Sequence, residues 1–313
     1  MTATSTPPRE AAPAQRVRQR PGDRVFAGLA TGAGLTILVI LAGVAAFLIY
    51  QAAPALVAPA SEIAGGQGFW RYAGVLVFGT LISSALALVI GAPLGVGIAL
   101  FITHFAPRRL AAPLGYVIDL LAAIPSIVYG LWGVFVFAPA LQPIYAWLTE
   151  NLGWIPLFAG PVGSGRTMLT VGLVLAVMIL PVITALSREV FRQTPTLQQE
   201  AALALGATRW EMIKYAVIPY GKSGVVAASM LGLGRALGET MAVAAVLSIG
   251  GGITFNLISN QNPATIAANI ALQFPESSGL AVNTLVATGL VLFVITFLVN
   301  FAARAIVART SKG

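Results

Sequence analysis

The sequence predicts an all-α, polytopic membrane protein with six transmembrane helices. Of its 313 residues, 58% are hydrophobic and 9% are charged, and the mean hydropathy is +0.88, whereas soluble domains carry about 25% charged residues. Six apolar runs are each long enough to cross a bilayer, which needs about 20 residues. Lys and Arg collect in alternate connecting segments, which is the pattern that membrane topology produces. The composition therefore excludes soluble and disordered proteins.

The expected spans cover most of the chain after a polar tail. Residues 1–24 are rich in Pro, Thr, Ala and Arg, so we expect a basic, disordered tail ahead of a transmembrane domain over residues 25–313. The first apolar run is longer than the hydrophobic core of a signal peptide, which has about 7–15 residues. It is therefore expected to remain uncleaved. The six expected spans are residues 25–50, 72–103, 114–141, 167–186, 223–249 and 282–306.

The distribution of positive charge predicts the orientation. Only Arg71 and Arg166 fall in the loops of one side, and Arg235 lies inside a span. Because short cytoplasmic loops are enriched in Lys and Arg, the other side is expected to be cytoplasmic and to hold both termini. The Lys and Arg on that side are Arg9, Arg16, Arg18, Arg20, Arg24, Arg108, Arg109, Arg188, Arg192, Arg209, Lys214, Lys222, Arg304, Arg309 and Lys312.

Several function classes are excluded by what the chain lacks. The net charge of +8 does not indicate nucleic-acid binding, because the basic residues are spread among loops without an aromatic and basic cluster. Cys is absent, and the lone His104, beside Arg108 and Arg109, is expected to be a solvated surface residue. Residues 216–223 resemble a phosphate-binding loop but lack its first glycine and a preceding strand. We therefore expect no catalytic residue, metal site or cofactor in this chain.

Three ionisable residues fall within the expected spans: Asp119, Arg235 and Glu239. Each costs a few kcal/mol at the bilayer centre and is expected to face protein or water. Arg235 lies 12 residues into its span, about 18 Å from the cytoplasmic end, and Glu239 follows one helical turn later, where the two can pair. One interpretation is a self-neutralising ion pair. A working role is favoured, since a buried ion pair rarely stabilises more than apolar packing does.

The chemistry of these side chains suits an oxyanion. The planar guanidinium of Arg235 presents five donors, and an ionised Glu239 accepts a hydrogen bond from a protonated ligand oxygen. We therefore hypothesise a path that favours phosphate over sulfate, which carries no proton near neutral pH. Asp119 begins a helical face that continues to Ser126, and it is either a path residue or a residue bonded near the interface. Thr240, next to Glu239, is a further candidate.

Two glycine spacings predict close helix contacts. Gly91 and Gly95 form one small-xxx-small pair, and Gly234 and Gly238 form the other. The second pair would place Arg235 beside a close helix contact.

The loop of residues 187–222 between the fourth and fifth spans is expected to be structured. Thr196 is expected to cap a helix that ends at Gly206, because the intervening residues are good helix formers and glycine favours helix ends. A second short helix is expected from Thr208 to Tyr215. The loop is either a docking surface for a partner or an interfacial connector.

The loop also carries a family resemblance. Residues Glu200, Ala201 and Ala202, with Gly206 and the pair Ile218 and Pro219, resemble the EAA signature of ABC importer permeases. The chain departs mildly from it, with Ala216 in place of Ile and Ile218 in place of Leu. Residues 120–133 and 232–242 are similar to the PstC-type permeases of phosphate-specific transport systems.

The resemblance implies the type I ABC importer permease fold in the bacterial plasma (inner) membrane. It implies uptake of inorganic phosphate from an extracytoplasmic binding protein, with a second, related permease subunit and two cytoplasmic ATPase subunits that bind ATP and Mg. It assigns Arg235 and Glu239 to phosphate passage. Membrane lipid is the remaining partner, and no nucleic acid is expected. The alternatives are a permease for another oxyanion, such as molybdate or sulfate, and a stand-alone secondary transporter in which Asp119 and Glu239 relay protons.

Overall fold

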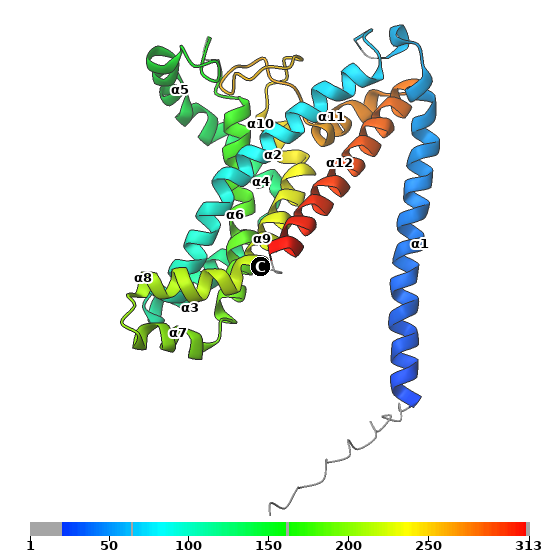
Figure 1. Cartoon of the computed structure of the whole chain (residues 1–313). Coiled ribbons are helices and arrows are strands. Elements are labelled where there is room, and N and C mark those ends of the chain that lie inside the picture. The colour runs from blue at the N-terminus through cyan, green and yellow to red at the C-terminus, as the bar shows by residue number, and fades with distance from the viewer. Residues whose placement is uncertain (1–20, 64, 161–162, 311–313) are drawn as a thin grey trace, which may run out of the picture. The chain divides into compact units, whose positions relative to one another are not determined.

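The computed structural model describes residues 21–63, 65–160 and 163–310, which divide into a unit up to Phe47 and a unit from Leu48 onward (Figure 1). The described residues are helical apart from connecting segments, and they contain no strand beyond one parallel bridge between Ile249 and Asn262. Six helical stretches are long and apolar enough to cross a membrane. The predicted fold class is confirmed.

Helix α1 (Pro21–Val57) makes up the described part of the first unit and reaches into the second. Its apolar side chains up to Phe47 are exposed, as expected of a helix whose solvent is lipid. Its final turns belong to the second unit, where Ala52 and Ala55 are buried in a cluster with Phe69, Ala73 and Ala287.

The second unit contains the remaining helices. Three π-turns, at Phe101–Phe105, Gly133–Phe137 and Ile213–Val217, interrupt longer helical stretches without ending them. Figure 1 places α3, α7 and α8 at one end of this unit, the α7 end, whereas α11 and the segment of residues 247–265 lie toward the other, the α11 end. The helices are α2 (Phe69–Leu100), α3 (Arg108–Ala122), α4 (Ser126–Trp132), α5 (Ala138–Leu152), α6 (Met168–Arg192), α7 (Thr196–Ala204), α8 (Arg209–Met212), α9 (Ile218–Leu237), α10 (Met241–Val246), α11 (Ile266–Gln273) and α12 (Leu280–Thr310).

The core forms around α6, the most buried of the candidate spans, which packs against α2 and α9. Small residues allow this approach. A Cβ on Gly91 would lie 3.0 Å from Ile179 Cγ1, and one on Gly232 would lie 2.8 Å from Ile183 Cδ1. The close contact predicted at Gly91 is confirmed. No such contact forms at Gly234 within the described chain, because a Cβ there meets nothing within 4 Å. Gly234 lies about 200° around the helix from Gly232, on the opposite face.

Two expected spans differ from the structure because the helix breaks inside an apolar run. The third does not run from residue 114, since α3 ends at Ala122 and a new helix starts at Ser126 after Pro125. Proline lacks an N–H and disfavours helix in the residue before it, so the apolar pattern continues while the helix stops. The fifth span starts earlier than expected, at Arg209, and ends at Leu237 instead of residue 249.

The loop between α6 and α9 is helical, as expected, with different details. Gly206 has φ +86°, a conformation that favours glycine, and it ends the α7 region. The predicted cap at Thr196 is wrong, because Thr196 is already helical and Pro195 precedes it. Thr208 caps α8 through a capping box with Glu211. From there the helix continues through the π-turn into α9, so the predicted boundary near Lys222 is absent.

Candidate functional site

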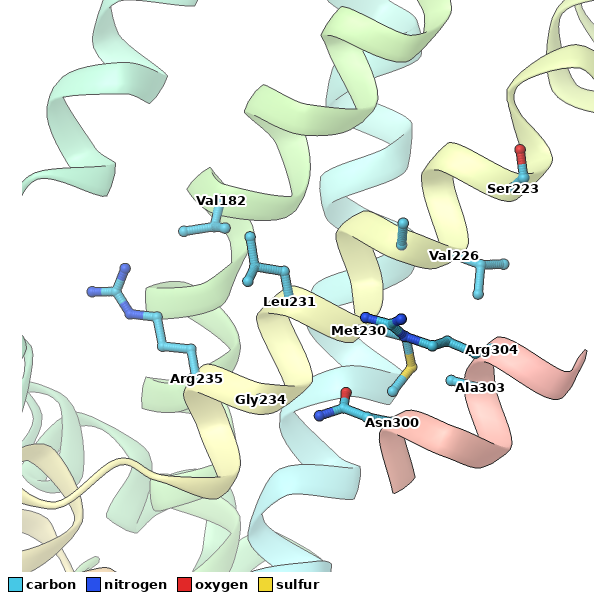
Figure 2. Close-up of a pocket in the computed structure, with 11 residues that line it drawn as sticks. Val182, Ser223, Val226, Met230, Leu231, Gly234, Arg235, Asn300, Ala303 and Arg304 are labelled. Atoms are coloured by element: carbon cyan, nitrogen blue, oxygen red, sulfur yellow. The ribbon is translucent and has the colours of Figure 1, made fainter. Parts of the chain in front are cut away.

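Arg235 lies two residues from the end of α9, half-buried, where it lines a hollow of about 790 Å³ between α9 and α12. We call this the α9–α12 hollow; α12 contributes Asn300 and Arg304 to it. Figure 2 shows these two side chains extending from α12 toward α9, whereas the side chain of Arg235 extends away from α12. From Ser223, which also lines the hollow, to Arg235 the helix rises about 18 Å. The hollow therefore follows α9 for most of its length.

Arg235 also lies close to α4. Its charge acts electrostatically on the hydroxyl of Tyr129, which donates a hydrogen bond to the Leu121 carbonyl at 2.9 Å. This bond bridges the break between α3 and α4, so the hydroxyl on which the Arg235 charge acts is held in place by the backbone. Sequence reasoning missed Tyr129, because one aromatic residue in an apolar run carries no signal.

Glu239 is buried, with 8% of its surface exposed, in the break between α9 and α10. Its Oε1 accepts a hydrogen bond from the Ala242 N–H at 3.1 Å and so caps the start of α10. Since α9 ends at Leu237, Arg235 and Glu239 do not share one helical face as expected. Among the residues that the structure describes, they form no ion pair.

The break is held against α4 by a close backbone approach. A Cβ on Gly130 would lie 2.9 Å from Ala242 Cα, so only glycine fits without movement. Thr240 is half-buried and donates a hydrogen bond to the Gly238 carbonyl at 3.2 Å, which closes the turn between the helices. Ser126 is the half-buried first residue of α4. Arg235, Glu239 and the α4 contact thus surround the end of α9.

Asp119 lies apart from this group, in α3 at the α7 end (Figure 1). Both carboxylate oxygens accept from Nη2 of Arg188 on α6 at 3.1 Å. Asp119 is half-exposed, whereas Arg188 is 13% exposed. The expected continuous face from Asp119 to Ser126 is absent, because residues 123–125 break the helix between them. The ion pair fastens α3 to the last turns of α6.

The residues of the EAA signature lie on and around α7. Glu200 and Ala201 are exposed, whereas Ala202 packs against a buried cluster that includes Phe191, Met212 and Ile213. The side chain of Ile218 joins the same cluster, and Pro219 occupies the first turn of α9. Ala99 and Leu100, from the end of α2, complete it. One small core therefore connects α7 with α2, α6 and α9.

The helices of this loop expose large apolar side chains beside charged ones such as Glu200. Leu197 is 78% exposed, Leu205 is 90% exposed and Trp210 is 56% exposed. Large apolar side chains left exposed in a loop indicate a contact with another molecule. Of the two interpretations of this loop, the exposed surface favours docking.

His104 differs from its expected role as a solvated residue. It is half-buried in the π-turn that ends α2, with Nδ1 2.7 Å from the Thr103 hydroxyl. Its side chain also interacts with Gln199 of α7. The sequence could not show this link, because the partner lies far along the chain. In the described ranges, no group of three or more His, Cys, Asp or Glu side chains could hold a metal ion.

Comparison with known proteins agrees with this arrangement. The family model described as "Binding-protein-dependent transport system inner membrane component" matches residues 91–312. The chain is 48% identical to "Phosphate transport system permease protein PstC 2" of Mycobacterium tuberculosis, over 94% of both chains. It is 42% identical to PstC of Mesorhizobium japonicum, over 92% of this chain and 90% of the other. PstC of Xylella fastidiosa is 38% identical, over 100% of this chain and 99% of the other.

Solved structures share the fold. The chain aligns with a bacterial ABC transporter for alginate import at a TM-score of 0.56 and 15% identity, over 91% of this chain and 99% of that one. It aligns with the inward-facing MetNI methionine ABC transporter at a TM-score of 0.51 and 19% identity, over 77% and 95%.

Proposed function

Because the chain belongs to the family of binding-protein-dependent transport system inner membrane components, we propose that it is a permease subunit of an ATP-driven importer of inorganic phosphate. The observation that carries the proposal is the identity of 38–48%, over at least nine-tenths of the chain, with permeases named for phosphate transport. Arg235, a half-buried residue at the edge of the hollow along α9, supplies the chemistry, since arginine pairs well with oxyanions.

The proposed complex contains a second, related permease subunit, two cytoplasmic ATPase subunits and an extracytoplasmic phosphate-binding protein. ATP and Mg are bound by the ATPase subunits, and this chain contributes no nucleotide site. The α7 end then faces the cytoplasm of a bacterial cell, and both termini are cytoplasmic in its plasma membrane. The positive-charge distribution supports this orientation.

The coupling mechanism follows from the packing of α7. The proposed ATPase contact is the surface of Glu200, Ala201 and exposed Leu205. Ala202 packs against the small core that α7 shares with α2, α6 and α9, so a displacement of α7 moves that core. The helical stretch Arg209–Leu237 is 29 residues long, about 43 Å at 1.5 Å per residue. It carries cluster residues at one end and Arg235 at the other. A tilt imposed at α7 therefore moves Arg235.

The path is proposed to run along the α9–α12 hollow past Arg235, with Ser126 and Thr240 beside the end of α9. The Arg235 guanidinium offsets the charge of the anion, with Arg304 as a second cation lining the same hollow. Such a site must hold the anion only transiently, as transport requires. One oxygen of Glu239 is engaged by the Ala242 N–H. The other is proposed to accept a hydrogen bond from the protonated oxygen that phosphate has and sulfate lacks. Asp119 is proposed to support α3 and to stand outside the path.

Uptake by the reconstituted complex tests the proposal. Phosphate is expected to accumulate in vesicles only with loaded binding protein and ATP, and excess sulfate or molybdate is expected to leave the rate unchanged. Competition by either anion would assign the path to another oxyanion. Uptake that persists without the ATPase subunits would identify a stand-alone secondary transporter and contradict the proposal.

A further inference from the structure

A second hollow, of about 280 Å³, lies toward the α11 end between the start of α2, the helix α11 and the segment around Gly251. We call it the α2–α11 hollow. Gln67, Arg71 and Tyr72 line it from one side, and Asn269 and Gln273 from the other. One water occupies about 30 Å³ of the liquid, so the space holds a hydrated tetrahedral anion. It lies at the opposite end of the unit from α7.

The walls of this hollow carry a connected set of polar groups. The Asn269 side chain, 5% exposed, donates from Nδ2 to the Tyr72 hydroxyl at 2.7 Å. That hydroxyl donates in turn to Oε1 of Gln273 at 3.1 Å. Both hydrogen bonds are therefore donated in the same direction, from Asn269 to Tyr72 and from Tyr72 to the Gln273 carbonyl oxygen. Gln273 is exposed, and its amide nitrogen has no acceptor among the described residues, so both its hydrogens can bond to solvent or to a ligand.

Arg71 is the charged member of the set. Its side chain is exposed, at a position that neither the charge distribution nor the helix dipole favours. It lies in the first turn of α2, where the helix dipole disfavours a cation. It is also one of two arginines on the side that is otherwise depleted of positive charge. The other one, Arg166, is engaged: Nη2 donates to the Ala245 carbonyl at 2.9 Å and Nε to the Val246 carbonyl at 3.3 Å. Arg71 forms no ion pair with any residue that the structure describes.

We propose that the α2–α11 hollow is an outer oxyanion site that takes inorganic phosphate before it reaches Arg235. The inference rests on the proposed function, which makes the α11 end extracytoplasmic. Arg71 supplies the charge-assisted hydrogen bonds, and the amides of Gln67 and Gln273 supply neutral donors. One cation with neutral donors binds weakly enough to pass the anion on. Phosphate then binds at two successive sites on the path, first at Arg71 and then at Arg235.

Binding of inorganic phosphate to the purified complex tests this site directly. Line broadening in phosphorus NMR detects weak binding. A maltoside detergent contains no phosphate headgroup, so the signal comes from inorganic phosphate and not from a lipid. The measurement uses an Arg235→Gln background, which removes the inner site. Adding Arg71→Gln is expected to weaken the remaining binding about tenfold, the usual effect of a lost hydrogen bond to a charged group. Arg71→Lys is expected to restore part of it.

The matched control is Arg109→Gln, the same chemical change at an exposed arginine of α3, which is expected to leave phosphate binding unchanged. Equal binding with and without Arg71→Gln would overturn the inference. So would a loss of affinity for the binding protein with unchanged phosphate binding, which would make Arg71 a docking residue. These outcomes differ from failure of the proposed function, in which the wild-type complex would not import phosphate at all.

Discussion

Replacing Gly130 with alanine tests the contact that holds α10 against α4. The new Cβ would lie 2.9 Å from Ala242 Cα and 3.2 Å from Ala245 Cβ, whereas carbon atoms pack at about 3.5–4.0 Å. The two helices must therefore separate by about 0.6–1 Å. Because the nearest atom belongs to the backbone, a rotamer change cannot relieve the overlap.

The expected cost combines two opposing effects. Overpacking of this kind costs about 1–3 kcal/mol, and alanine stabilises a helix by about 0.5–1 kcal/mol relative to glycine. Mid-range values of about 2 and about 0.75 kcal/mol give a net loss of about 1.3 kcal/mol. Gly97 of α2 is a matched control, because it is exposed and a Cβ there meets nothing within 4 Å. Gly97→Ala is expected to be neutral or to stabilise by up to about 1 kcal/mol.

The assay is the half-life of the folded, detergent-purified complex at a fixed elevated temperature, since membrane complexes unfold irreversibly. Gly130→Ala is expected to shorten it by up to about tenfold relative to Gly97→Ala, if the contact is lost in the unfolding transition state. Uptake is expected to fall as well, because α10 begins beside Glu239. Equal half-lives for the complexes carrying Gly130→Ala and Gly97→Ala would refute the close approach of α4 and α10.

Two further predictions concern Glu239 and His104. Glu239→Gln keeps an oxygen for the Ala242 N–H, so thermal stability is expected to change little while sulfate begins to compete in the uptake assay; continued exclusion of sulfate would rule out the proposed proton recognition. His104→Ala removes the side-chain interaction with Gln199 of α7. Taken as about 1 kcal/mol, this loss is expected to weaken ATPase-subunit binding about fivefold in a titration. Gln198→Ala, an exposed neighbour in α7, serves as its control, and equal affinities for the two variants would show that His104 does not position α7.

The apolar runs predicted the number of membrane-spanning helices because span length and hydropathy are local properties of the sequence. The helix break at Gly238 was not predicted, and Pro125 indicates only a kink, since the apolar pattern continues through both positions. Hydropathy reports transfer from water, whereas these breaks depend on backbone hydrogen bonds. Asp119 was assigned to a span for the same reason, although α3 is a separate helix at the α7 end.

The candidate site was predicted in part. Arg235 and Glu239 were found because ionisable groups in apolar runs are costly, and the structure places them on either side of the end of α9. Their pairing was not predictable, since it assumed a continuous helix. Long-range partners such as Tyr129 beside Arg235, and Gln199 beside His104, depend on tertiary packing, which a single sequence does not encode in any local pattern.

Phosphate uptake by the reconstituted complex carrying Arg235→Gln tests the central claim most directly, with assembly and ATP hydrolysis followed in the same samples. We expect uptake to fall at least about tenfold, the usual effect of a lost hydrogen bond to a charged group, while assembly and hydrolysis persist. Arg235→Lys is expected to recover only part, because an ammonium lacks the planar fork of donors. Normal uptake by Arg235→Gln would contradict the account and reduce Arg235 to a structural residue of α9.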